Sequence, residues 1–312
     1  MTPQKQGCRV GTPEMEALNE TRAECGRGPA IPGLILADRV QPASELLDPL
    51  APGVEVCLDD RGDLLAYCRA ENGALRVDLP DLASFSYERG AGHVRAIPHR
   101  PLSPGFILET YHHCVLPLIL PALGTEVLHA SAIVGAAGVA AFCGVSGTGK
   151  STIAVALARR GYAIWADDAV AVETDEPVPT AIPLPFTVRL RSDSARFLAA
   201  AGERGPSAAV DLVDAQPAPL AVLCMLRRTP DATATVAVER LEAASACRAA
   251  LAHAYCFSVK DPAQKRRTIW NYLTMTGRVP AYEIRFRPGL EHLPAVLDAI
   301  EAILGRATTD PG

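Results

Sequence analysis

The sequence predicts an α/β protein with a small β-rich module on its N-terminal side. Three observations favour this class. Short strand-like segments divided by turn residues fill positions 31 to about 100, and apolar strands alternate with helical segments after position 126. A glycine-rich loop, Gly144–Thr152 (GVSGTGKST), joins one apolar strand directly to a helix.

Length and composition exclude several classes of protein. At 312 residues the chain can form one large domain or two ordinary ones. A net charge of -5 argues against a general nucleic-acid binder. The longest apolar run, Cys114–Leu123, is too short to cross a bilayer, and residues 1–20 lack the apolar core of a secretory signal. We therefore expect a soluble cytoplasmic protein with neither a membrane nor a nucleic acid as its partner.

The nine cysteines form no C-x-x-C pair, and their number is odd. Several of them stand inside apolar runs. We expect reduced thiols that pack as small hydrophobic side chains, and the missing paired spacing argues against zinc.

The N-terminal part divides into two regions. Residues 1–30 are rich in glycine, proline and charge, and are expected to lack fixed structure. Residues 31–125 are expected to form the β-rich module and a linking helix. Ser103 is a suitable N-cap and Pro104 a suitable first helical residue, so this helix would run to about Leu123 with a kink at its prolines. The expected module is antiparallel, with its strands in GLILAD, GVEVCLD, LLAYCRA, ALRVDL, ASFSYE and HVRAI.

The second domain is expected over residues 126–305, followed by a frayed tail, 306–312. It starts with two apolar strands joined by a turn at 135–138, and the second strand leads into the glycine-rich loop. A helix follows the loop and stops at Gly161. Later strands are expected in YAIWADDAVAVE, PLAVLCMLRR, ATVAVERL and PAYEIRF, and helices in AASACRAALAHAY, QKRRTIWNYLTM and LEHLPAVLDAIEAIL.

The loop matches the pattern G-x-x-x-x-G-K-[ST] between a strand and a helix. Glycines let successive N–H groups point inward, and the helix N-terminus adds partial positive charge. Lysine can then contact phosphate oxygens, and the following hydroxyl can bind Mg²⁺. The alternative is a fortuitous glycine-rich turn, but the strand–loop–helix context favours a nucleotide site. The predicted ATP-binding residues are Gly144, Ser146, Gly147, Thr148, Gly149, Lys150, Ser151 and Thr152.

Two adjacent carboxylates, Asp167 and Asp168, end the next apolar strand. On an extended chain they would point to opposite sides, unless a distorted backbone brings both to one site. This arrangement suits one carboxylate for Mg²⁺ and the other as a base for an attacking hydroxyl. A solvated turn is the alternative. Which aspartate has which role stays open.

His129 begins the strand that precedes the hairpin. Antiparallel pairing aligns the start of that strand with the end of the next one, where the glycine-rich loop begins. His129 is therefore also a candidate site residue, although histidines in apolar surroundings are often structural.

The stretch 128–173 resembles the catalytic domain of the HPr kinase/phosphorylase family. In that family a histidine-bearing strand leads into the phosphate loop, and a later strand ends in ADD. The resemblance implies a phosphoenolpyruvate-carboxykinase-like P-loop fold with a mixed sheet. It also implies transfer of a phosphoryl group from ATP to a serine hydroxyl. By this resemblance Lys150 contacts phosphate, Ser151 binds metal, and His129 lies at the periphery.

The chain departs from that family after the acidic strand. Pro183–Ser192 (PLPFTVRLRS) replaces a segment similar to L-E-I-R-G-x-G, which argues against HPr itself as the substrate. The segment is more similar to relatives encoded with lasso-peptide genes, which phosphorylate the C-terminal serine of a precursor peptide. The expected partner is thus a peptide or small protein with an acceptor serine, and a homo-oligomer stays open.

Three basic groups could help bind extra phosphate or an acidic substrate. Arg189 and Arg191 alternate on one expected strand and are the first candidates. The others are the pair 227–228 and the cluster 260–267. Solvated surface charge is the alternative for each group.

Two further functions also stay open: a kinase of a small-molecule hydroxyl, and a nucleotide-binding regulator without transfer activity.

Overall fold

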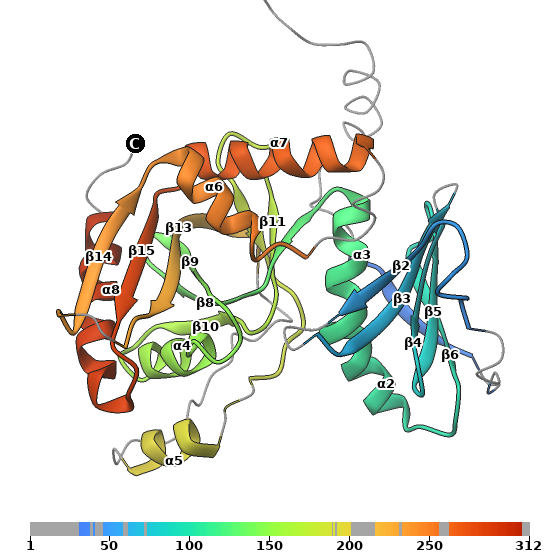
Figure 1. Ribbon diagram of the computed structural model, residues 1–312, viewed down its shortest axis with the longest axis horizontal. Coiled ribbons are helices and arrows are strands. Elements are labelled where there is room, and N and C mark those ends of the chain that lie inside the picture. Colours follow the sequence, from blue (N-terminus) through green and yellow to red (C-terminus); the bar gives the residue numbers. More distant parts are fainter. Residues whose placement is uncertain are drawn as a thin grey trace, which may run out of the picture. The chain divides into compact units, whose positions relative to one another are not determined.

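The computed structural model describes residues 31–37, 40, 46–58, 62–71, 74–188, 190, 192–200, 216–230, 233–255 and 262–307. The segment 1–30 and the end of the tail, 308–312, lie outside the described residues, so the expectations for them stay predictions. The described elements form two β-sheets with flanking helices, and the predicted α/β class is confirmed (Figure 1).

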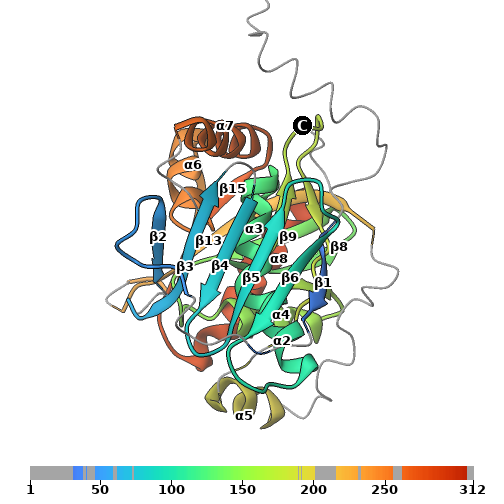
Figure 2. The same cartoon turned by 90° about the vertical axis from the view of Figure 1, so that its right-hand side faces the viewer.

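The first sheet contains the six strands expected from the turn spacing, in the order β1-β6-β5-β4-β3-β2 (Figure 2). Strands β2 to β6 form an antiparallel meander, but β1 pairs with β6 in parallel. The expectation of an entirely antiparallel module is wrong on this point, because no tight turn joins β1 to β2 and fixes its direction. The strands are β1 (Gly33–Leu36), β2 (Val54–Leu58), β3 (Leu64–Glu71), β4 (Ala74–Leu79), β5 (Ala83–Glu88) and β6 (His93–Pro98).

A helical segment follows the first sheet, and it begins as the sequence predicts. The Ser103 hydroxyl accepts the Phe106 N–H at 3.3 Å, with proline in the first turn. The irregularity lies before Pro117, where Leu116 N–H donates to the Tyr111 carbonyl. Because proline lacks an N–H and its ring crowds the preceding turn, that turn widens into a π-helical one. The segment comprises α2 (Pro104–Thr110), η2 (Tyr111–Val115) and α3 (Leu116–Leu123).

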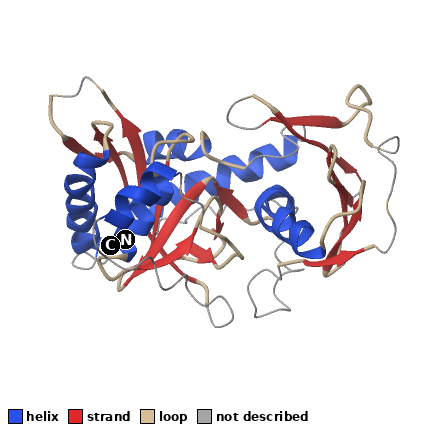
Figure 3. Ribbon diagram, turned by 90° about the horizontal axis from the view of Figure 1, so that it is seen from below, coloured by secondary structure: helices blue, strands red, loops and turns tan. Residues whose placement is uncertain are grey.

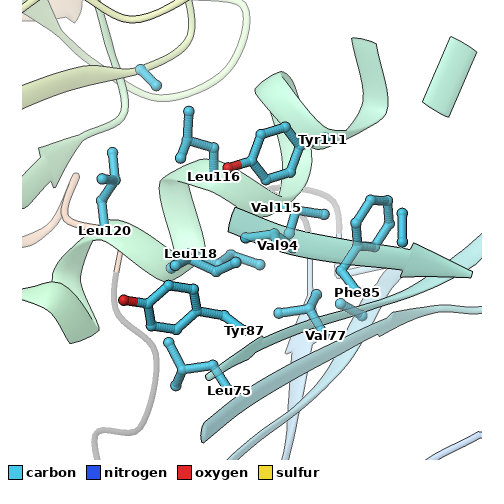
Figure 4. Close-up of a cluster of buried hydrophobic side chains, with 14 of the residues drawn as sticks. Leu75, Val77, Phe85, Tyr87, Val94, Tyr111, Val115, Leu116, Leu118 and Leu120 are labelled. Carbon is cyan, nitrogen blue, oxygen red and sulfur yellow. The ribbon is translucent and has the colours of Figure 1, made fainter. Parts of the chain in front are cut away.

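This segment packs on the first sheet with a buried apolar face (Figure 4). The rings of Phe85 and Tyr111 stack with centroids 6.3 Å apart. By length and composition alone, the 20 residues Pro104–Leu123 could cross a membrane. Half of that stretch is buried inside the protein, so packing on the sheet accounts for its apolar character.

The second sheet is mixed, in the order β10-β8-β9-β13-β12-β11-β7, and β15 and β14 continue it beyond β13. Strand β13 is parallel to β9 and to β15, whereas the other described pairs are antiparallel. The strands are β7 (Glu126–Leu128), β8 (Ala130–Gly135), β9 (Gly138–Cys143), β10 (Ala163–Ala166), β11 (Val170–Glu173), β12 (Thr180–Ile182), β13 (Ala218–Arg228), β14 (Val236–Leu241) and β15 (Ala281–Phe286).

Helices cover both faces of this sheet (Figures 1 and 3). Along β9, Val139, Ala141 and Cys143 pack with α6 (Ala243–Leu251) and α7 (Pro262–Arg278). The alternate residues Ala140 and Phe142 pack with α4 (Lys150–Ala158) and α8 (Leu293–Ala307). Burial on both faces explains why β9 is apolar throughout, without the alternation of a half-exposed strand. A short helix, α5 (Ser192–Ala200), and a turn, η3 (Leu290–His292), complete the described elements.

Candidate functional site

The glycine-rich loop connects β9 to α4, as the motif requires. Gly147 and Gly149 have φ values of 81° and 110°, which an L-residue rarely adopts. Thr148 N–H donates to the Val145 carbonyl at 3.1 Å. Among the described residues, none accepts a hydrogen bond from the N–H groups of Ser146, Gly147 or Gly149. The loop therefore presents unpaired donors beside a helix N-terminus, which suits an anion.

Lys150 opens α4 and folds back over the loop. The residue is only 6% exposed, and Nζ donates to the Gly144 carbonyl at 2.8 Å. Burial raises the pKa of the Cys143 thiol to about 12, with the nearby Lys150 charge acting in the opposite direction. A buried cation thus lies where β9 meets the loop.

Gly144 allows the loop to pass close to β13. A Cβ at this position would lie 3.0 Å from the Leu226 carbonyl oxygen and 3.3 Å from the Thr148 Cβ. Only a residue without a side chain fits this contact without a shift of its neighbours. Packing against β13 therefore favours glycine at the first position of the motif.

Two strands that the sequence predicts as continuous are each divided beside this loop. Strands β7 and β8 are separated by His129, and β10 and β11 by 167–169. β11 pairs with β7 up to Leu128, and β10 pairs with β8 from Ala132, so the two interruptions lie opposite each other. The polar residues of both segments therefore gather at one place.

Asp167 is fixed there by a side chain that sequence reasoning missed. Its carboxylate accepts the Ser131 hydroxyl at 2.6 Å, and both residues are buried. Ser131 lies opposite Phe142 and two residues from Ile133, and both of these side chains pack with α4. By strand alternation Ser131 points to the same face. Asp167 therefore lies on the face that carries Lys150, one strand from the end of β9.

The backbone of Asp168 is not extended, although an extended chain was the first of the two alternatives for the acidic pair. Its φ is 67°, in the left-handed region, which agrees with the alternative of a distorted backbone. Its carbonyl lies 3.4 Å from the Tyr255 hydroxyl. Its side chain is partly exposed, unlike that of Asp167.

His129 lies at the end of the sheet where the loop begins. Ala130 pairs with Cys143, so the next residues along the two strands are His129 and Gly144. The His129 N–H donates to the His253 carbonyl at 2.7 Å, and its ring lies against Tyr255 with centroids 5.9 Å apart. The chain after α6 thus borders both His129 and Asp168.

The remaining predicted loop residues differ in their surroundings. The Thr148 hydroxyl is bound to the Val145 carbonyl at 2.6 Å. The Thr152 hydroxyl lies 3.0 Å from that of Ser194 on α5, so it faces a helix. Ser151 is partly buried in the first turn of α4.

Among the described residues, Arg228 is a basic residue that lies at the loop. Its Nε donates to the Thr148 carbonyl at 3.0 Å, and a guanidinium nitrogen would lie 3.6 Å from a Cβ at Gly149. The sequence contained a signal for it. Because β13 is parallel to β9, the carboxyl ends of both strands meet at one edge, and Arg228 ends β13.

The preferred basic candidates, Arg189 and Arg191, lie outside the described residues. The strand was expected over TVRLR, 187–191, and its described residues, 187, 188 and 190, form no strand, so the expectation is wrong for them. Prolines at 183 and 185 precede this stretch, and each of them removes a ladder donor. In the third group, Arg267 donates to the Pro121 carbonyl at 3.0 Å and thereby ties α7 to α3.

The residues present fit a nucleotide with Mg²⁺. In the described part of the chain, no group of three or more His, Cys, Asp or Glu side chains could hold a metal alone. Mg²⁺ does not require one, because it commonly takes one or two protein oxygens together with phosphate and water. Ser151 and the acidic pair could provide such oxygens, and the loop amides could provide donors for phosphate.

Comparisons with known proteins assign no family. No family model matches the sequence, and no curated protein matches it significantly. Among solved structures, the HPr(Ser) kinase/phosphatase from Coxiella burnetii is similar, with a TM-score of 0.32 and 12% identity. The match covers 59% of this chain and 93% of that chain. A likeness of this strength supports no conclusion about fold or activity.

Proposed function

We propose that this protein is a kinase that uses ATP and Mg²⁺ to phosphorylate a serine hydroxyl of a peptide or small protein. The observation that carries the proposal is the joint placement of the loop and Asp167. Unpaired amides, a buried lysine and a buried carboxylate lie at one edge of the sheet and on one face. We also propose that the protein acts in the cytoplasm, because ATP is available there.

Each group of the loop has a role in phosphate binding. The amides of Ser146, Gly147 and Gly149 would donate to phosphate oxygens, and Lys150 would exchange its bond to Gly144 for one to phosphate. Arg228 would add charge from the neighbouring strand. Cations placed in this way stabilise the charge of a transferring phosphoryl group.

Ser151 and Asp167 would hold Mg²⁺, which when bound neutralises charge on the phosphates. The Ser131 hydroxyl donates to Asp167, and a hydrogen bond to a carboxylate stabilises its charged form. The bond to Ser131 thereby fixes the orientation of the Asp167 carboxylate, which suits a metal ligand. Asp168, with a partly exposed side chain, would accept the proton of the attacking hydroxyl.

The serine acceptor rests on the sequence resemblance described above, and a C-terminal serine of a lasso-peptide precursor is its most specific form. We therefore propose peptides that end in serine as the first substrates to test. A small-molecule hydroxyl is the alternative acceptor for the same site.

The test incubates the purified chain with ATP, Mg²⁺ and a synthetic precursor peptide that ends in serine. Mass spectrometry should show a gain of about 80 Da, which is absent when alanine replaces that serine. Lys150→Ala should abolish transfer, whereas Arg240→Ala, which removes an exposed cation of β14, should not. Asp167→Asn should raise the Mg²⁺ requirement, and Asp168→Asn should lower the rate of transfer. Tight ATP binding without transfer to any peptide would contradict the proposal and favour a regulator.

A further inference from the structure

Two cysteines of the first sheet lie in contact, far along the chain from the nucleotide site. The Sγ atoms of Cys57 on β2 and Cys68 on β3 are 3.2 Å apart. Cys57 pairs with Ala66 and Cys68 with Glu55, so the two cysteines are diagonal neighbours across an antiparallel pair. An irregularity in the register follows Cys57 directly. Bulges of this kind increase local twist, which helps diagonal side chains to meet.

The two thiols differ in access to solvent. Cys68 is fully buried, whereas Cys57 is partly exposed on β2, the edge strand of the sheet. An oxidant dissolved in water can therefore reach Cys57 first. Cys143 and Cys224 of the second sheet differ from this pair, because both of them are buried and neither is open to an oxidant in the way that Cys57 is.

The hydrogen bond between the two thiols also shifts their pKa values in opposite directions. Its contact with Cys68 lowers the pKa of Cys57, while the same contact and burial raise the pKa of Cys68. Burial raises the pKa of Cys224 as well. Because the thiolate is the reactive form, Cys57 combines access with reactivity.

We propose that Cys57 and Cys68 form a reversible disulfide when the protein meets a peroxide. The Cys57 thiolate attacks hydrogen peroxide, which yields a sulfenic acid and hydroxide. The Cys68 thiol then attacks the Cys57 sulfur, so that the S–S bond forms, the S–O bond breaks, and water leaves with the thiol proton. The sulfur atoms need to approach each other by only about 1 Å more to reach bonding distance.

The bond would hold the edge strand β2 to β3. Edge strands have one unpaired side and open more readily than central ones, so a link at Cys57 would restrict such opening. This inference concerns the first sheet and does not depend on the proposed kinase activity. A thiol, such as glutathione, would reverse the bond by exchange.

The test uses the reduced full chain, treated with a low concentration of hydrogen peroxide, alkylated, and digested with trypsin without reductant. Arg61 separates the two cysteines, so a disulfide joins peptide 40–61 to peptide 62–69. The linked pair should weigh about 2 Da less than the sum of the reduced peptides. The yield of the linked pair from the folded chain should exceed the yield from the chain in urea by more than about tenfold, because folding holds the thiols in contact.

Three variants make the result decisive. In Cys68→Ser, Cys57 should stop at the sulfenic acid and be captured by dimedone. In Cys57→Ser, neither the linked pair nor capture at Cys68 should occur. Cys114→Ser, which replaces a partly buried cysteine of η2, should leave the linked pair unchanged. Recovery of both cysteines as separate alkylated peptides after peroxide treatment, or equal linkage in urea, would overturn the proposal.

Discussion

Replacing Gly149 by alanine isolates the role of the loop's backbone. Gly149 precedes α4 with φ at 110°, and a new Cβ would meet only the Arg228 guanidinium, at an ordinary 3.6 Å. Crowding is therefore small, and the cost comes from the backbone angle. Gly161, just beyond the other end of α4, has φ at 101° with nothing within 4 Å of such a Cβ. Gly161→Ala is thus a matched control.

Both substitutions should destabilise the fold to a similar extent. A non-glycine residue in this backbone region lowers the free energy of unfolding by about 1–3 kcal/mol. A loss of about 2 kcal/mol would lower Tm by roughly 4–8 °C in a protein of this size. In Gly149→Ala, but not in Gly161→Ala, a change of the backbone angle that relieves this strain would also turn a loop amide away from the phosphate. Loss of one hydrogen bond to a charged group is worth about 1.5–3 kcal/mol, or about 10- to 100-fold in Kd.

The assay pairs thermal unfolding with titration of a fluorescent ATP analogue in the presence of Mg²⁺. Both variants should show a lower Tm, but only Gly149→Ala should show a higher Kd. If Gly149→Ala bound the analogue as tightly as the natural chain, the loop amides would have no part in nucleotide binding. If both variants lost affinity equally, the effect would come from stability and the reasoning would fail.

Three further predictions concern single side chains. Arg228→Ala should weaken binding of the ATP analogue about tenfold, while Arg227→Ala, which removes an exposed ion pair of β13, should change Kd by less than about twofold. Ser131→Ala removes the buried bond to Asp167 and should lower the unfolding free energy in urea by about 2 kcal/mol; an unchanged value would contradict the burial of that pair. Burial raises the pKa of Glu126 above 4.5, so its contribution to stability is present at low pH and is lost as pH rises through the folded-state pKa. Glu126→Gln should flatten that decline in urea unfolding measured between about pH 4 and 7, and an unaltered slope would assign the decline to other groups.

The glycine-rich loop was predictable because its constraints are local. Residues within nine positions fix the turn, the donors and the start of the helix, and the structure gives that geometry to 144–152. The six strands of the first sheet were predictable for the same reason, since turn residues separate them. The direction of β1 and the π-helical turn before Pro117 were not predicted, because both depend on packing between distant segments.

The sequence alone determined the glycine-rich loop, the strand before it and the helix after it, since these depend on backbone angles and side chains close together in the chain. The tertiary structure decided which residues join them. Ser131 reaches Asp167 and Arg228 reaches the loop only because β8, β10 and β13 lie beside or near β9. The two interrupted strands, opposite each other at His129 and 167–169, likewise arise from pairing across the sheet. Pairing brings together residues from separate parts of the chain, and no local pattern specifies that choice of partners.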